Sequence, residues 1–122
     1  MKRAKHFYEE NERVLKGIKA YEKGNIEEFG ELVNESGYSS INYWETGSDE
    51  LIKLYEILKS CKGVYGTRFS GAGFKGCVLA IINPDYIDSI KEKVEYEYLS
   101  AFPNLRGKYS AHICHTADGV KL

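Results

Sequence analysis

The chain has 122 residues, 17 of them Lys or Arg and 18 of them Asp or Glu, so its formal net charge is −1. This length suits one domain with a modest core, and the balanced charge argues against a nucleic-acid binder that works mainly by neutralising phosphates. No apolar run is long enough to cross a bilayer and the N-terminus is polar, so we expect neither a membrane helix nor a signal peptide. We interpret the scattered Cys61, Cys77 and Cys114 as buried thiols in a reducing cytoplasm.

The N-terminal part of the chain predicts a helical hairpin. A helix is expected over residues 3–22, because apolar side chains recur there with helical spacing. Its expected buried stripe consists of Ala4, Phe7, Val14, Ile18 and Tyr21, with Asn11 on the same line. Gly24 and Asn25 tolerate the left-handed conformation that ends a helix. A second helix is expected from residue 26, with an apolar side formed by Ile26, Phe29, Leu32 and Val33.

Residues 36–47 interrupt the helical pattern and are predicted to form a loop, because Ser, Gly and Asn are frequent there. The same segment carries four bulky residues, Tyr38, Ile41, Tyr43 and Trp44. An isolated domain would have difficulty covering all four. Two interpretations stay open: the four residues pack back on the helices, or they form a contact surface for another domain or a ligand.

Two further helices are marked by the residues at their ends. Ser48 caps a third helix, acidic residues occupy its first turn, and Gly63 ends it. Its expected buried residues are Leu51, Leu54, Tyr55 and Leu58. Residues 83–85 open a fourth helix with an Asn-Pro-Asp sequence, and Pro103 ends it. Its expected core residues are Ile87, Ile90, Val94 and Tyr98.

Residues 64–69 and 76–82 predict two strands, because both segments are rich in β-branched, aromatic or other apolar residues. Residues 109–116 predict a third strand that follows the fourth helix. This order of elements favours an α+β fold, a ferredoxin-like two-layer sandwich in which a small antiparallel sheet packs on helices. The strand that such a sheet still lacks either lies outside this chain or is formed by its C-terminal residues.

The glycine-rich loop between the first two strands is the most informative motif. Gly71, Gly73 and Gly76 fit the spacing G-x-G-x-x-G on a rigid apolar support. A dinucleotide-binding fingerprint requires a helix after the last glycine, whereas a strand is expected here. A protein-kinase loop would be followed by H-R-D and D-F-G, which do not occur. Residues 73–76 match the G-x-x-G clamp of KH domains, but the chain has no surplus of basic residues. A tight loop without a ligand is the remaining alternative.

His112, Cys114 and His115 raise the question of a metal site. His112 and Cys114 would share a strand face and supply two ligands, but a structural zinc site normally has four, with a second local pair. The sequence has no C-x-x-C and no second close pair of His or Cys. We therefore expect no metal site and interpret these side chains as ordinary parts of the sheet.

Five segments carry a resemblance to a known family. In chain order they are RAKHFYEENERV, GNIEEFGELVNESGYSS, SDELIKLYEIL, GVYGTRFSGAGFKGC and HTADGVKL. With these segments the chain resembles the C-terminal domain of galactokinase-type sugar kinases of the GHMP family, and it looks most similar to the galacturonokinase and arabinokinase branch. The glycine loop departs from the usual galactokinase pattern, with Ala72 and Lys75 where glycines are commoner.

The resemblance implies a role for the loop as the third conserved motif of the family, which lies against the phosphate-binding loop of an N-terminal domain. The cofactor-binding residues that it implies are Ser70, Gly71, Ala72, Gly73, Phe74, Lys75 and Gly76. Physical reasoning agrees, because closely approaching backbone amides support a phosphate loop that bulky side chains would push away. Lys75 either adds a phosphate contact or is simply solvated. We predict that Gly73→Val damages catalysis in the full enzyme and leaves the fold largely intact.

The resemblance also implies parts that this chain does not match. No segment corresponds to the family's phosphate-binding loop, sugar-recognition segment or catalytic aspartate. We therefore expect residues 1–122 to be a single C-terminal domain without the N-terminal nucleotide-binding domain, with no catalytic residue and no activity alone. The complete enzyme is expected to be a cytoplasmic sugar 1-kinase that uses ATP and Mg2+ on a monosaccharide such as galactose. No cofactor is expected on this chain alone.

The expected partner is an N-terminal GHMP kinase domain in the same or a separate chain, with neither nucleic acid nor a membrane as a partner. Without that domain, we predict self-association through Tyr38, Tyr43 and Trp44 or through an open sheet edge. Two other functions stay open. One is a non-catalytic, kinase-derived binding or regulatory module, and the other is a ligand-binding ferredoxin-like domain unrelated to kinases.

Overall fold

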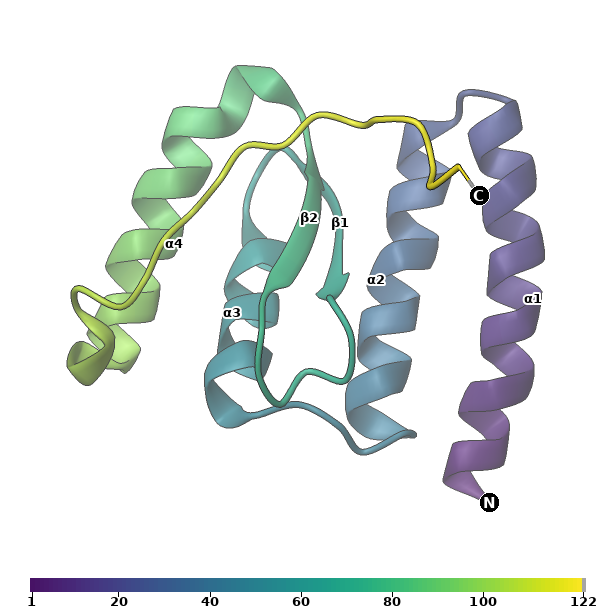
Figure 1. The fold of residues 1–122 in the computed structure, drawn as a ribbon, viewed down its shortest axis with the longest axis horizontal. Helices are drawn as coiled ribbons and strands as arrows, with labels where there is room; N and C mark the ends of the chain where they lie inside the picture. The colour runs from purple at the N-terminus through teal and green to yellow at the C-terminus, as the bar shows by residue number, and fades with distance from the viewer. Residues whose placement is uncertain (122) are drawn as a thin grey trace.

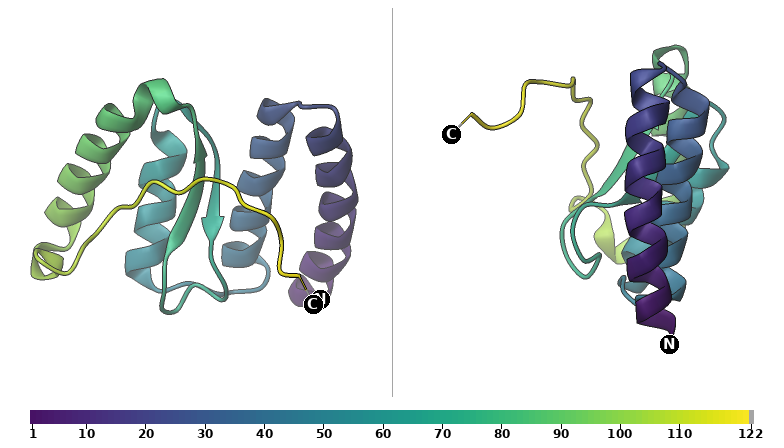
Figure 2. Two further views of the ribbon diagram at one scale, coloured as in Figure 1. Left: turned by 45° about the horizontal axis from the view of Figure 1, so that its top comes forward. Right: turned by 90° about the vertical axis from the view of Figure 1, so that its right-hand side faces the viewer.

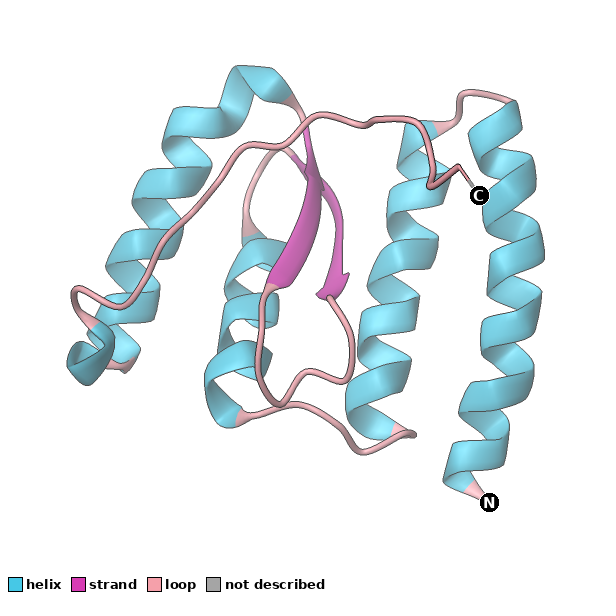
Figure 3. Ribbon diagram, viewed as in Figure 1, coloured by secondary structure: helices cyan, strands magenta, loops and turns pink. Residues whose placement is uncertain are grey.

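The computed structural model describes residues 1–121, which form helices and a small antiparallel sheet (Figures 1 and 3). In chain order the elements are α1 (Lys2–Glu22), α2 (Ile26–Asn42), α3 (Asp49–Ser60), β1 (Val64–Phe69), β2 (Val78–Ile82), the 3-10 helix η1 (Pro84–Tyr86), α4 (Ile87–Ala101) and the 3-10 helix η2 (Pro103–Leu105). The expected α+β class is confirmed. Within residues 1–121, no helix is both long enough and apolar enough to cross a membrane.

The sheet of the described residues consists of β1 and β2, which pair antiparallel. Phe69 lies opposite Val78, and the register becomes irregular between Val64 and Gly66, as a β-bulge produces. In Figure 1, α3 and α4 lie to one side of the strands, and α2 and then α1 lie to the other. The two strands are therefore flanked by two different pairs of helices.

The core lies between α3, α4 and one face of the sheet. Its two clusters of buried residues are Ile57, Cys61, Ile90, Val94 and Tyr98, and then Leu51, Tyr55 and Phe69. The stripes expected for the third and fourth helices are confirmed at their central positions, although Leu54, Leu58 and Ile87 are only partly buried. Apolar periodicity located this core correctly because α3, α4 and the sheet cover one another.

The third strand predicted over residues 109–116 does not form. Residues 109–121 have no regular secondary structure, and no backbone–backbone hydrogen bond joins them to β2. The ring of Tyr109 contacts that of Tyr98, with 5.7 Å between centroids, and the segment then runs across the sheet and away from the helices (Figure 2). A strand is defined by a hydrogen-bonded neighbour, and this segment has none in the described chain. Leu122, the last residue of HTADGVKL, lies outside the described residues.

Helix α1 forms at the expected position, but a different face of it packs on α2. Gly17 and Ala20 are its buried residues. The expected buried stripe is exposed throughout, at Ala4, Phe7, Asn11, Val14, Ile18 and Tyr21. The prediction of this stripe as the buried face is therefore wrong. The small residues Gly17 and Ala20 let the two helices approach closely, whereas nothing in residues 1–121 covers the apolar stripe.

Helix α2 continues to Asn42, so the loop predicted over residues 36–47 is wrong for its first part. The small residues that suggested a loop are the contact surface of a helix, because α2 packs directly against β1. A Cβ atom on Gly30 would collide with the carbonyl group of Tyr65, so only glycine permits this approach. Gly37 faces the ring of Tyr55 in the same way, at 2.5 Å from a Cβ atom to Cε2. Burial raises the pKa of Tyr55 to about 12.

Of the four bulky residues after Gly37, some pack on the helices and others stay exposed, so each of the two interpretations holds for part of the set. Ile41 and Tyr43 are partly buried, whereas Tyr38 and Trp44 are 49% and 44% exposed. The ring of Trp44 lies 5.5 Å from that of His6, and Tyr38 lies 6.2 Å from Tyr43 in an edge-on contact. These side chains thus pack partly on α1 and on one another. Self-association through them stays a prediction.

The three cysteines do not share one environment. Cys61 is buried in the core, its thiol donates to the carbonyl oxygen of Ile57, and burial raises the pKa of that thiol. Cys77 and Cys114 are exposed, so their interpretation as buried thiols is wrong. Both lie outside the helices and strands, Cys77 in the loop before β2 and Cys114 in the irregular C-terminal segment.

Candidate functional site

The glycine-rich loop connects β1 to β2 at one end of the hairpin (Figure 1). The backbone N–H of Ser70 donates to the carbonyl oxygen of Cys77 at 3.0 Å and closes the base of the loop. Gly71, Gly73 and Gly76 have φ angles of +80°, +78° and +106°. A residue with a side chain is strained in this region of φ, so the path of the loop depends on all three glycines.

One residue of the loop is held inside the domain. Gly73 is buried, and its carbonyl oxygen accepts a hydrogen bond at 2.7 Å from the N–H of Ser48, the N-cap residue of α3. Gly73 also lies against the ring of Phe69, which is 2% exposed. On another side of that ring is Gly47, where a Cβ atom would come within 2.8 Å. The loop is therefore fixed to the core and to the start of α3.

The remaining residues predicted to bind the cofactor are open to solvent. They are Ser70, Gly71, Ala72, Phe74, Lys75 and Gly76. A Cβ atom on Gly71 would meet no atom within 4 Å, and one on Gly76 would meet only the carbonyl oxygen of Ser70, at 3.8 Å. The loop thus has one anchored residue and a free side on which a neighbouring loop or a ligand fits.

The anchoring of Gly73 contradicts the prediction that Gly73→Val leaves the fold largely intact. A Cβ atom there would overlap the ring of Phe69. The substitution would also place a β-branched residue at a φ of +78°. Gly73 therefore serves the core as well as the loop, and Gly71 is the position at which the free side is tested without a steric clash.

The loop offers hydrogen-bond donors and a positive charge but no group for acid–base chemistry. Its donors are main-chain amides, the hydroxyl group of Ser70 and the ammonium group of Lys75, which suit a phosphate or a loop that holds one. His112 and Cys114 lie in the irregular C-terminal segment rather than on a strand. No group of three or more His, Cys, Asp or Glu side chains in residues 1–121 is arranged to hold a metal ion.

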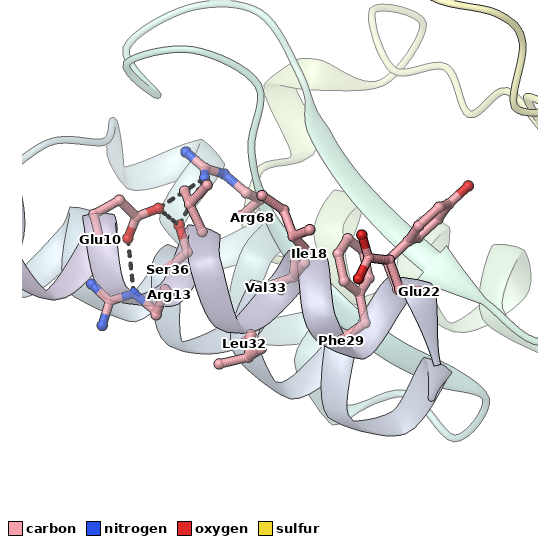
Figure 4. Close-up of a pocket in the computed structure, with 12 residues that line it drawn as sticks. Glu10, Arg13, Ile18, Glu22, Phe29, Leu32, Val33, Ser36 and Arg68 are labelled. Carbon is pink, nitrogen blue, oxygen red and sulfur yellow. Dashed lines mark hydrogen bonds and ion pairs between the residues drawn. The ribbon is translucent and has the colours of Figure 1, made fainter. Parts of the chain in front are cut away.

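A polar network joins the strand that leads into the loop to α1 and α2 (Figure 4). Arg68, the residue before Phe69, donates from Nη1 to Ser36 Oγ at 2.7 Å and to Glu10 Oε1 at 3.3 Å. The hydroxyl group of Ser36 donates to the same carboxylate. Arg13 donates from Nε to Glu10 Oε2 at 2.8 Å. The network therefore ties α1 and α2 to the end of β1, next to the first residue of the loop.

Glu10 is the centre of this network, and its environment changes its pKa. Burial by itself would raise that pKa, but the hydrogen bonds from Ser36 and Arg13, together with the charges of Arg13 and Arg68, outweigh burial. The net effect is a pKa below the usual value, so the carboxylate stays ionised. Beside the network runs a groove of about 560 Å³ whose further lining is largely apolar, from α1 and α2.

Sequence reasoning missed Glu10, Ser36 and Arg68, as well as Asn34, whose side chain bonds to β1. One signal was present for Arg68, because an arginine inside a strand of apolar and small residues requires an anionic partner. Nothing in the sequence showed that the partner would come from α1, 58 residues away. Ser36 falls in the segment predicted to form a loop, no sequence pattern marks Asn34, and only the position of both residues on α2 shows what they bind.

These observations define an α+β domain that carries a fixed, projecting glycine hairpin. A sequence profile described as GHMP kinases C terminal matches residues 15–100. The chain therefore belongs to the family of GHMP kinase C-terminal domains, and the resemblance inferred from the sequence is confirmed.

Two relatives of this domain are named as sugar kinases. The chain is 46% identical over 125 residues to a galacturonokinase of Arabidopsis thaliana, covering 99% of this chain and 30% of the relative. It is 44% identical over 120 residues to a galactokinase of Clostridium beijerinckii, covering 98% of this chain and 30% of the relative.

A solved structure supports the same assignment. The crystal structure of Lactococcus lactis galactokinase complexed with galactose superposes with a TM-score of 0.79 at 36% identity, covering 84% of this chain and 26% of that one. The chain thus spans between 26% and 30% of the length of these three kinases.

Proposed function

We propose that this chain is the C-terminal part of a sugar 1-kinase that transfers the γ-phosphate of ATP to galactose or a galactose-like monosaccharide. Its relatives, named galacturonokinase and galactokinase, support this proposal, as does the similar structure crystallised with galactose. In the proposal residues 1–122 form one domain, and an N-terminal kinase domain in the same or a separate chain supplies the phosphate-binding loop and the catalytic group. The enzyme is cytoplasmic, in keeping with the free, exposed thiols of Cys77 and Cys114.

The observation that carries the proposal is the free side of the glycine loop. Phosphoryl transfer depends mainly on positioning and on charge stabilisation, so a support for the phosphate site has to be rigid and to allow close approach. The loop meets both needs, because Gly73 is anchored and Gly71 faces open space. We assign the supporting contact to Ser70, Gly71, Ala72, Phe74, Lys75 and Gly76, and the anchoring role to Gly73.

The residues of the loop fit one part of the cofactor. Amide groups and an ammonium group attract phosphate oxygens, so the loop suits the phosphate side of ATP. The loop contains no carboxylate, and we assign the ligands of Mg2+ to the partner domain. When bound, Mg2+ neutralises the charge of the transferring phosphoryl group. We expect the isolated chain to hold neither ATP nor Mg2+ tightly and to show no sugar-dependent ATP hydrolysis.

The test uses a chimera in which this chain replaces the matched region of the C. beijerinckii galactokinase. The substitution Gly71→Val should lower kcat/KM for galactose by at least about tenfold, because a displacement of about 1 Å near the reacting groups costs on the order of 100-fold. Release of ADP in the presence of galactose measures the effect. Circular dichroism checks that the variant is folded.

Gly107→Val is the matched control for this variant. Gly107 has a φ of +83° and Gly71 one of +80°, and a Cβ atom at either position meets nothing within 4 Å. Both substitutions therefore impose the same kind of backbone strain, but Gly107 lies outside the loop, and its variant should keep its activity. Equal activities of the two variants would remove the loop from the mechanism. An unsubstituted chimera that folds and is inactive would favour the binding or regulatory module.

A further inference from the structure

The connection between α2 and α3 passes beside the glycine loop and holds it in place (Figure 1). At the end of this connection, the N–H of Ser48 donates to the carbonyl oxygen of Gly73 at 2.7 Å. The preceding residue, Gly47, lies against the ring of Phe69, and the same ring contacts Gly73. The position of the glycine loop therefore depends on the path of residues 43–48.

That path contains a residue in an unfavourable backbone conformation. Among residues 1–121, Glu45 is the one residue other than glycine with a positive φ angle, at +62°. A side chain makes this left-handed conformation costly, and it persists only where the surroundings impose it. The side chain of Glu45 does not impose it, because its ion pair with Lys2, at 3.4 Å, is exposed and therefore weak. The cause lies in the neighbouring residues.

The residues on both sides of Glu45 are bonded to the end of α2. Thr46 is 9% exposed, and its N–H and its hydroxyl group both donate to the carbonyl oxygen of Ser40, at 3.1 and 3.0 Å. The N–H of Trp44 donates to the carbonyl oxygen of Ser39 at 3.1 Å. Carbonyl groups in the last turn of a helix have no partner inside the helix, so they are free to accept these bonds. Because its neighbours are held, Glu45 has to absorb the turn between them.

Helix α1 touches the same connection through weaker contacts. Lys5 Nζ donates to the hydroxyl oxygen of Tyr43 at 3.1 Å and lies 4.2 Å from the centre of that ring. The ring of Trp44 lies 5.5 Å from that of His6. Lys5 and Trp44 are exposed, and exposed polar contacts contribute little because water competes for them. The side chain of Thr46 is shielded from water, so the loss of its hydrogen bond has the larger effect.

We propose that Thr46 is a positioning residue for phosphoryl transfer in the complete kinase. Its hydroxyl group holds Glu45 in the left-handed conformation, which directs the N–H of Ser48 to Gly73 and keeps the glycine loop in one place. This inference rests on the proposed function, in which that loop supports the phosphate site. Such a support has to be fixed to within about 0.5 Å for positioning to accelerate the reaction. Thr46 acts on the reaction through Ser48 and Gly73.

The first experiment uses the chimera with the C. beijerinckii galactokinase. Thr46→Val removes the hydroxyl group and keeps the shape of the side chain. It should lower kcat at least about fivefold, the effect of losing one buried hydrogen bond. KM for galactose should stay within about twofold, because the loop supports the phosphate site and not the sugar. Thr46→Ser keeps the hydroxyl group and should retain kcat within about twofold.

Ser60→Ala is the matched control for Thr46→Val. The hydroxyl group of Ser60 donates to the carbonyl oxygen of Ile57 at 2.7 Å, at the end of α3 that lies away from the glycine loop. Each variant therefore loses one hydroxyl bond to a carbonyl group in the last turn of a helix. Ser60→Ala should leave kcat unchanged. Equal losses of kcat in the two variants would indicate a general effect of stability and would overturn the proposal.

A second substitution tests the route through residue 45. Glycine adopts a positive φ angle without strain, so Glu45→Gly removes the need for the hydroxyl group of Thr46. When Glu45→Gly is added to Thr46→Val, kcat should return to within about twofold of the unsubstituted chimera. A folded double variant that stays as slow as Thr46→Val would show that the hydroxyl group does not act through the conformation of Glu45, and would overturn the proposal.

Amide hydrogen exchange in the isolated chain gives a measurement that does not depend on kinase activity. Thr46→Val should make the amide of Ser48 exchange at least about fivefold faster. The amide of Asn83, bonded to the carbonyl oxygen of Gly63 at the same distance of 2.7 Å, is the internal reference and should not change.

The two proposals therefore fail separately. Faster exchange at Ser48 together with an inactive chimera supports the hold on the loop and counts against the kinase function. An active chimera in which Thr46→Val keeps the full kcat overturns the positioning role and leaves the kinase function standing. Unchanged exchange at Ser48 in Thr46→Val overturns the positioning role whatever the activity of the chimera.

Discussion

The two sides of the sheet are held by different kinds of contact. On one side, α3 and α4 bury apolar side chains such as Ile57, Ile90 and Val94, which are 4%, 6% and 5% exposed. On the other side, α1 and α2 meet β1 through glycines, through Asn34 and through the network around Glu10. The first side is an ordinary apolar core, and the second depends on close approach and on hydrogen bonds.

The difference shows what can be concluded from an apolar stripe on a helix. Both α1 and α4 carry one, but within residues 1–121 only the stripe of α4 is covered by other elements. The stripe of α1 includes Val14, Ile18 and Tyr21, which are 55%, 50% and 71% exposed. Exposed apolar surfaces of this kind mark contacts with other parts of a protein. Periodicity therefore identifies a face that has to be buried, without identifying what buries it.

The largest expected effect comes from the close approach of α2 to β1. Gly30→Ala should lower the free energy of unfolding of the chain by more than about 3 kcal/mol, because the new Cβ atom collides with the main chain of Tyr65 and no rotamer relieves the contact. Urea unfolding followed by circular dichroism measures the change. Gly17→Ala is the matched control in α1, since its Cβ atom would lie 3.6 Å from Phe29 Cε2, an ordinary contact.

Gly17→Ala should leave stability unchanged or raise it by up to about 1 kcal/mol, because alanine favours a helix more than glycine does. Similar losses for both alanine variants would mean that the two glycines serve helix geometry in general. The close contact between α2 and β1 would then not explain the requirement for glycine at position 30.

A smaller expected effect on stability compares the apolar stripe of α4 with that of α1 directly. Ile90→Ala should cost about 3 kcal/mol, because it leaves a cavity in the α3–α4 core. Ile18→Ala removes the same atoms from α1 at a position that is 50% exposed, and should change stability by no more than about 0.5 kcal/mol. Urea midpoints of the two variants test the comparison. A loss at Ile18 as large as that at Ile90 would show that α1 is covered in the isolated chain.

The smallest expected effect concerns the ionised side chain of Glu10, in the network that joins α1 and α2 to β1. The pKa of Glu10 is lower in the folded chain than its usual value near 4.5, so the unfolded state binds a proton more readily. The stabilising contribution of Glu10 is therefore complete above about pH 4.5 and is lost as the pH falls through the folded-state pKa. Glu10→Gln should make the acid side of the stability profile less steep.

Thermal unfolding at a series of pH values between about 3 and 7 measures this slope. Ser36→Ala should reduce the slope in the same direction, because Ser36 donates one of the hydrogen bonds that lower the pKa of Glu10. A slope that is identical in wild type and Glu10→Gln would contradict the role of the network.

Local chemistry made several elements predictable. Ser48 caps α3, Asn83 caps the short helix before α4, and the positive φ angles of Gly71, Gly73 and Gly76 follow from their place in a hairpin loop. Each of these features depends on a few neighbouring residues, so a single sequence contains the information. The projecting loop was likewise predictable, although the burial of Gly73 under Phe69 was not.

The sequence by itself determined where helices begin, where the glycine loop bends, and which stripes of α3 and α4 are apolar enough to be buried. Only the tertiary structure decided that α1 turns Gly17 rather than Ile18 toward α2, and that Asn34 takes the place of a strand beside β1. It also decided that residues 109–116 lie unpaired. The physical reason is that helix propensities and caps act over one or two turns. These three outcomes depend instead on which elements, distant in the sequence, pack against a given helix face or strand edge.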